Sequence, residues 1–312
     1  MKQPNIFCKL LIIGHLCTLF FSISSGQNKL EFFAPSPIQD NKRLVPLVAT
    51  EGVFYLGSMI CLNVLWYKNY PHSSFHFFND DKEWLQMDKL GHVLTAYTVS
   101  RLTSALYTWS GIREPSSNAY GTALAMAYQT NIEIFDGFSS AWGFSPGDMI
   151  ANTLGAGLFI SQQALWDEQR VTMKISFHRT EYSQYRPDEL GTNFIQQSLK
   201  DYNGQTYWLS FAIASFLPKG NKVPNWLCLD FGYGAEGMIG GITNPQVFDK
   251  NGNEVCFDRY RQVYCSLDID LTRIPTNSGA LKALFGAVSF MKVPMPTLEL
   301  SRGKLKFHIL YF

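Results

Sequence analysis

The sequence predicts an α+β protein, in which a bundle of about four apolar helices is followed by a smaller region that contains β-strands. The helices are apolar enough for the bundle to be embedded in a membrane. Composition gives the first indication, because 46% of the residues are hydrophobic and only 16% are charged, against about 25% charged in typical soluble domains. The second indication is a change of pattern near residue 168. There, long apolar stretches of helical length give way to shorter runs rich in β-branched and aromatic residues.

Residues 1–26 have the pattern of a secretory signal peptide. Lys2 and Lys9 precede an apolar run that ends in small residues at Gly26. A retained membrane anchor is the alternative, but the run of about 14 residues is shorter than the roughly 20 that a membrane-spanning helix needs. We therefore expect cleavage before Gln27 and assign residues 27–45 to a linker.

The cysteines give no motif for zinc binding or redox chemistry, because no C-x-x-C is present. Cys8 and Cys17 do not lie in the small-residue pattern of a lipoprotein signal, so lipid attachment is not expected. Farther along, Cys61 lies in an apolar run where a buried thiol is expected. Cys256 and Cys265 are spaced so that they could close a hairpin with a disulfide in an exported protein.

The charge balance argues against a nucleic-acid partner. Removing the first 26 residues takes away two lysines and no acidic residue, which leaves 24 basic and 25 acidic side chains. A protein with no excess of positive charge lacks the electrostatic attraction that drives binding to phosphates.

Residues 46–168 form the predicted helical domain, with apolar stretches at 46–66, 89–110, 118–135 and 146–166. The first stretch carries only Glu51 as a charge and is long enough either to cross a bilayer or to be the central helix of a bundle. The other stretches carry polar groups at helical intervals, which should face one another inside a bundle or a water-filled cavity. Gly121, Gly155 and Gly157 should let these helices approach closely.

Residues 169–312 form the predicted mixed β/α region. We expect strands at 170–178, 226–234, 261–271 and 303–312, a short helix at 192–199, and either a helix or a buried strand at 205–217. The segment 279–292 is an amphipathic helix that either rests on a membrane surface or packs in the core. A small sheet packed on the helical half or on a membrane surface is the expected arrangement.

Three pairs of polar residues lie on single faces of three consecutive predicted helices. The pairs are Asp88 with His92, Glu133 with Asp136, and Asp148 with Asn152. If they converge, His92 can act as a general base with Glu133 or Asp136 as its partner. A divalent cation held by Asp88, His92, Glu133 and Asp136 is a further alternative.

Each pair also has a purely structural explanation. Asp88 lies where a helix N-cap is expected, and Ser145 precedes Pro146 and Asp148 in a near capping box. Glu133 and Asp136 come just before Gly137, a common helix end, although acidic groups there oppose the helix dipole. A structural polar network is therefore favoured over a catalytic role, and no set of metal ligands is assigned.

The ordered motifs in residues 88–156 resemble those of the uncharacterised YfiM-like family of envelope proteins. They are D-K-x-x-H at 88–92, E-x-x-D at 133–136, a loop with Trp and Gly, and D-x-x-x-N-x-x-G-A at 148–156. The first and last motifs are also similar, more distantly, to VanZ-like membrane proteins. Unlike some short relatives that look like lipoproteins, this chain has no lipoprotein cleavage motif and adds a long region after Asp167.

The resemblance implies an exported or membrane-associated envelope protein with a small helical core, but it supplies no reaction and no cofactor. It carries over as characteristic residues Asp88, Lys89, His92, Glu133, Asp136, Asp148, Asn152 and Gly155. Two later segments, 199–211 and 231–241, look like motifs of larger relatives. Within the first of them, Asp201, Asn203, Gln205 and Trp208 could line a site shared between the two halves, or simply form a loop before an aromatic core segment.

The function predicted from these observations is that of an exported, membrane-associated envelope protein with a structural or auxiliary role. We expect it on the periplasmic side of a membrane, favouring the outer membrane, with a membrane lipid or another envelope component as its partner. The alternatives are a hydrolase or transferase acting on a lipid or cell-wall precursor through His92 and Glu133 or Asp136, and a module that binds a divalent metal.

Overall fold

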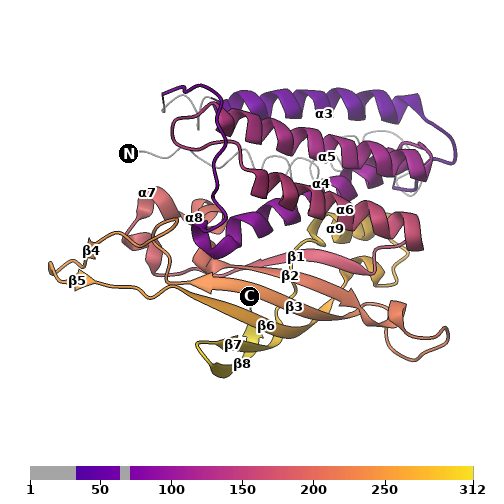
Figure 1. Ribbon diagram of the computed structural model, residues 1–312. Helices are drawn as coiled ribbons and strands as arrows, with labels where there is room; N and C mark the ends of the chain where they lie inside the picture. Colours follow the sequence, from indigo (N-terminus) through magenta and orange to yellow (C-terminus); the bar gives the residue numbers. More distant parts are fainter. Residues whose placement is uncertain (1–32, 64–70, 312) are drawn as a thin grey trace.

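The computed structural model describes residues 33–63 and 71–311 and confirms the α+β fold class. A layer of helices covers one end of an antiparallel sheet (Figure 1). The predicted signal peptide, with Cys8 and Cys17, lies outside the described residues, as does the side chain of Cys61.

The helical layer consists of four long helices: α3 (Asn41–Leu62), α4 (Met87–Trp109), α5 (Glu114–Gly137) and α6 (Pro146–Trp166). Helices α4, α5 and α6 pack against one another, and α3 lies along the outer side of α5 (Figure 1). Tyr55 of α3 packs edge-on against Tyr128 of α5 with ring centroids 5.7 Å apart. The idea that the first apolar stretch is the central helix of the bundle is therefore wrong.

Helix α3 begins earlier than the sequence pattern indicated, so residues 41–45 are helical and do not belong to a linker. Asp40 is the N-cap, and its carboxylate accepts a hydrogen bond of 2.9 Å from the backbone N–H of Lys42. Pro46 lies in the second turn of the helix, where it forgoes a single backbone hydrogen bond. Among the described residues, α3 alone is long and apolar enough to cross a membrane, with 17% of its most apolar window buried.

Two of the three predicted helix-contact glycines are confirmed. A Cβ on Gly155 would lie 2.2 Å from the backbone oxygen of Val93 in α4, and one on Gly121 would lie 2.5 Å from the backbone oxygen of Ser100. A Cβ on Gly157 would meet nothing within 4 Å. Only the first two positions therefore need glycine for the close approach of α5 and α6 to α4.

The main sheet has six antiparallel strands in the order β1-β2-β3-β6-β7-β8. Its strands are β1 (Val171–Phe177), β2 (Gln205–Ala212), β3 (Leu227–Glu236), β6 (Tyr260–Ile269), β7 (Met295–Ser301) and β8 (Lys304–Tyr311). The ambiguous segment 205–217 is strand β2 followed by a short helical turn, Ile213–Phe216. Strand β7 was not predicted, because Pro294 and Pro296 interrupt its apolar pattern.

Smaller elements complete the second half. They are β4 (Val247–Phe248) and β5 (Glu254–Val255), which form a short hairpin, and the helices α7 (Pro187–Leu190), α8 (Phe194–Lys200) and α9 (Gly279–Val288). No residue of α9 is buried, so this amphipathic segment is a surface helix and not a core helix. Cys256 and Cys265 are both free thiols, so the predicted hairpin disulfide is not formed.

The two faces of the sheet differ in polarity. Apolar side chains lie on the face that packs under the helices, where Met173, Tyr207 and Ala235 join Met87 and Phe159 in one core cluster. The opposite face carries polar and charged side chains, most of which are buried, although Lys304 and Lys306 of β8 are exposed. The buried ones are covered because the sheet curls: Tyr311 of β8 donates a hydrogen bond of 2.7 Å to Tyr264 of β6 and packs edge-on against Trp208 of β2. The polar face is therefore the concave one.

Candidate functional site

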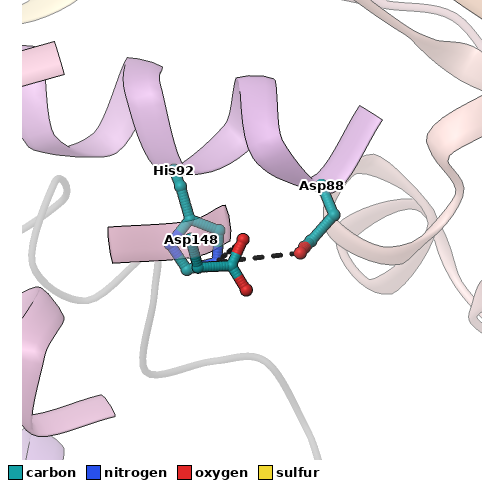
Figure 2. A group of neighbouring side chains, drawn as sticks. All are labelled: Asp88, His92 and Asp148. Carbon is teal, nitrogen blue, oxygen red and sulfur yellow. Dashed lines mark ion pairs between the residues drawn. The ribbon is translucent and has the colours of Figure 1, made fainter. Parts of the chain in front are cut away.

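The three predicted polar pairs converge where α4 and α6 begin and α5 ends. Figure 2 shows that His92 and Asp88 project from α4 toward Asp148 at the start of α6. Nε2 of His92 lies 3.6 Å from Oδ1 of Asp148 and 3.8 Å from Oδ2 of Asp88. Glu133 approaches from α5, with its Oε1 3.9 Å from Nδ1 of His92. The structure therefore brings at least one side chain of each predicted pair into the same space.

The two nitrogens of His92 have different roles. Nδ1 lies 3.1 Å from Oδ1 of Asn152, which also accepts a hydrogen bond of 2.8 Å from Nε2 of Gln129. A carbonyl oxygen only accepts, so the neutral tautomer that satisfies this contact has its proton on Nδ1 and a lone pair on Nε2, while Nε2 of Gln129 lies 3.3 Å from the same Nδ1. This lone pair points toward the carboxylates of Asp88 and Asp148. Asn152 and Gln129 thus fix the orientation of the imidazole.

Lys89 is the lysine at the centre of the cluster. Its Nζ lies 2.5 Å from Oδ1 of Asp80 and 2.7 Å from Oδ1 of Asp148, and 3.8 Å from Oδ2 of Asp88. Burial alone would lower the pKa of Lys89, but the charges of Asp88 and Asp148 raise it above its usual value. One firmly charged lysine thus faces three aspartates.

Acidic groups outnumber basic ones in this space, and the pKa values reflect it. Burial, followed by the charges of Asp148 and Asp136, raises the pKa of Glu133 to about 9. Burial and the charge of Asp88 raise the pKa of Asp148 to about 8, against the opposing effect of Lys89. Glu133 is 1% exposed, and its Oε1 has no hydrogen-bond partner among the described residues. The cluster therefore has room for additional positive charge.

The start of α6 forms as the sequence predicted. Ser145 is the N-cap, and its hydroxyl accepts a hydrogen bond of 3.1 Å from the backbone N–H of Asp148. The backbone N–H of Ser145 in turn donates to Oε2 of Glu133 over 3.2 Å. The capping residues and the cluster are thus one hydrogen-bonded unit.

The start of α4 differs from the prediction, because Asp88 is not its N-cap. The helix begins at Met87 after a turn in which Trp84, Leu85 and Gln86 all have left-handed backbone angles, with φ of 46°, 50° and 67°. Such angles are costly for residues other than glycine. Strand β3 and the loop after it hold this turn, since Trp84 N–H donates to the carbonyl of Gly241 over 2.8 Å and Tyr233 donates to the carbonyl of Leu85 over 2.7 Å. Asp88 is consequently in the first turn of the helix, and its carboxylate points toward the cluster.

The second half contributes a residue that the sequence did not single out. The hydroxyl of Tyr202 donates a hydrogen bond of 2.5 Å to Oδ1 of Asp88. Burial and the charge of Asp88 raise the pKa of this phenol well above its usual value, so it remains a donor. Tyr202 lies in the D-Y-N-G-Q segment that the sequence analysis selected, but its own side chain carries the contact.

The four residues predicted in that segment make hydrogen bonds to residues outside the cluster. Asp201 is fully buried and bonds to Asn203 and Thr180, and Asn203 bonds to the backbone of Met238. The amide of Gln205 donates to the carbonyl of Ser198. Trp208 lies on the concave face of the sheet, where its indole N–H donates to Ser176 over 3.0 Å. The expectation that Trp208 lines a shared site is therefore wrong, since alternate residues of a strand point to opposite faces.

The sequence analysis also did not assign Asp80 and Gln129 to the cluster. Gln129 lies four residues before Glu133 on the same face of α5, and this spacing is a signal that the sequence contains. Asp80 comes from a loop and has no such periodic signal. Asp136 lies close enough to Glu133 to raise its pKa, but it is not among the groups that surround Nε2 of His92.

The residues that could hold a metal ion differ from the predicted four. Ligand atoms of Asp88, His92 and Asp148 all lie within 4.8 Å of one another. Ligands that share a tetrahedral ion at about 2.1 Å are separated by roughly 3.4 Å, which is close to the distances from Nε2 to the two carboxylates. Asp148 thus takes the place that the prediction gave to Glu133 and Asp136.

The fold and the cluster together define an α+β protein with a buried centre of carboxylates, one histidine and one lysine at the ends of three helices. Residues 76–162 match a family model described as "Predicted periplasmic lipoprotein (DUF2279)". This segment contains the whole cluster apart from Tyr202 and excludes α3 and the sheet. No curated protein and no solved structure matches the chain, so the finer likeness to YfiM-like and VanZ-like proteins stays a prediction.

Proposed function

We propose that this chain is an exported, membrane-associated envelope protein whose helical layer binds a divalent cation between Asp88, His92 and Asp148. The family description of residues 76–162 supports a periplasmic setting. The signal-peptide pattern and the exposed apolar helix α3 support association with a membrane, for which the outer membrane is the favoured site.

The orientation of His92 carries the proposal. Asn152 engages Nδ1, so Nε2 offers its lone pair between two carboxylates at 3.6 and 3.8 Å. These distances are too long for hydrogen bonds and suit atoms that share an ion. One imidazole and two carboxylates favour zinc, iron or manganese over calcium. The excess of acidic groups around Lys89 would be relieved by the same ion.

Metal analysis of the purified full chain tests the proposal. After dialysis against zinc or manganese, the protein should retain close to one ion per chain, and His92→Gln and Asp148→Asn should each lose it. Glu51→Gln is the matched control, because Glu51 is a carboxylate of the same layer that bonds to Tyr107 far from the cluster. If the wild-type protein retains no more ion than the His92 and Asp148 variants, the cluster is a structural network of the kind the sequence favoured.

Hydrolysis or transfer on a lipid or cell-wall precursor is a second candidate. It is favoured by the ligand count, because three protein ligands leave a coordination position for water and substrate, as in catalytic zinc sites. In this role the cation would activate water, and Glu133 or Asp136 would be the candidate proton carrier. Cells that carry His92→Gln should lose the protein's function in the envelope while the abundance of the protein stays normal. Loss of the protein itself would contradict this candidate.

A further inference from the structure

The convex face of the sheet carries many exposed apolar side chains. One row of paired residues runs across five strands: Leu209, Phe231, Cys265, Leu298 and Phe307. Next to it runs a row in which Val263, Leu300 and Leu305 are paired. Phe307 is 65% exposed, and its neighbours Leu300, Leu305 and Ile309 are exposed as well.

The concave face has the opposite character. Lys174 forms a buried ion pair of 2.5 Å with Asp268, and Glu299 accepts hydrogen bonds from Gln262 and Ser301. A sheet in water places its apolar side chains inside and its polar ones outside. Here the polarity is inverted, which is the arrangement of sheets that contact lipid. Because buried polar side chains fill the concave face, the apolar side chains of the strands are left on the convex face.

The charges at the two ends of the convex face complement an anionic membrane. The β7–β8 turn carries the exposed cations Arg302 and Lys304, and the loop that follows β2 carries Lys219 and Lys222. Neither segment contains an acidic residue, and the two rows of the apolar face contain none either. Basic residues beside an apolar surface bind anionic headgroups.

We propose that the convex face of β2, β3, β6, β7 and β8 is the surface by which this protein enters one leaflet of an anionic phospholipid membrane. The face is continuous with the interface that β2 and β3 form with α4 and α6, so lipid would cover the part that the helices leave open. From Leu305 to Ile309 the strand advances four residues, or about 14 Å, less than half of the roughly 30 Å hydrocarbon core. The sheet therefore dips into the membrane without crossing it. The inference rests on the proposed membrane association and not on the cation site.

Flotation of the purified full chain with vesicles of equal parts phosphatidylglycerol and phosphatidylethanolamine tests this. Leu300→Asp and Phe307→Asp should each weaken binding by about tenfold or more, because a charge replaces an apolar group at the lipid contact. Phe248→Asp on β4, where Phe248 is 56% exposed, is the control and should bind as the wild type does, whereas Val53→Asp measures the separate contribution of α3. The replaced side chains are exposed, so unchanged thermal unfolding should accompany the loss.

The remaining outcomes separate the two proposals. Wild-type protein that does not float would overturn both the membrane association and this inference. Floating of the sheet variants with wild-type affinity, or loss only in Val53→Asp, would overturn the inference and leave membrane association standing. A dimer that Phe307→Asp converts to a monomer, with vesicle binding unchanged, would assign the face to self-association.

If the Asp variants do not fold, Phe307→Trp decides the question. Its added fluorescence must be quenched by brominated acyl chains, and absence of quenching would refute lipid contact.

Discussion

Replacing Asn152 by leucine tests whether one amide holds the cluster together. Asn152 is fully buried, and its Oδ1 accepts from Nδ1 of His92 and from Nε2 of Gln129. The variant leaves two buried donors without that acceptor, each at a cost of about 2 kcal/mol. Nδ2 of Asn152 has no hydrogen-bond partner among the described residues, so its removal returns about 1 kcal/mol. The expected net loss in the free energy of unfolding is about 3 kcal/mol.

Chemical denaturation of a double-mutant cycle measures this value. Gln129→Leu alone should cost about 1 kcal/mol, because His92 keeps its acceptor. The double variant should be less destabilised than the sum of the two single variants by about 1–2 kcal/mol, since neither partner of the lost bond remains. Asn152→Leu should also weaken zinc or manganese binding by about 10- to 100-fold, because the imidazole is no longer oriented. Additive single losses to within about 0.5 kcal/mol would refute the reasoning.

Two further predictions concern helix contact and pH. Gly155→Ala should lower the free energy of unfolding by about 3 kcal/mol, because its Cβ would lie 2.2 Å from the Val93 oxygen. Gly157→Ala should be neutral or slightly stabilising, because its Cβ would meet nothing within 4 Å. Equal melting temperatures for the two variants would contradict this. For Glu299, burial would raise the carboxyl pKa, but hydrogen bonds from Ser301, Lys306, His308 and Gln262 hold it at about 2. Its contribution of about 3 kcal/mol is therefore present above pH 4.5 and lost as the pH falls toward 2, so Glu299→Gln should flatten the acid limb of a stability–pH curve.

The sequence was most informative where a helical period carries the signal. Asp88 with His92 and Asp148 with Asn152 lie one turn apart on helices whose apolar stretches were plain, so their convergence could be predicted. The Ser145 cap followed from its local sequence in the same way.

Contacts set by the tertiary fold had no local signal. Asp80 lies in a loop without periodicity, and the partner of Tyr202 is 114 positions away in the chain. Trp208 and Tyr207 are neighbours in sequence, and only the pairing of β2 with β1 and β3 decides which of them faces the helices. The exposed apolar face of the sheet was also hidden, because an alternating strand looks the same whichever face meets water.

The left-handed turn at Trp84–Gln86 has a consequence for the order of folding. Each left-handed residue costs about 1–3 kcal/mol, and the contacts that hold the turn come from Gly241, Tyr233 and Arg261, about 150 positions or more downstream. During synthesis, α4 through α6 emerge long before those residues do. We therefore expect the cluster to assemble late, only after the sheet has formed, so that the helical segment and the sheet of this chain mature as a single cooperative unit.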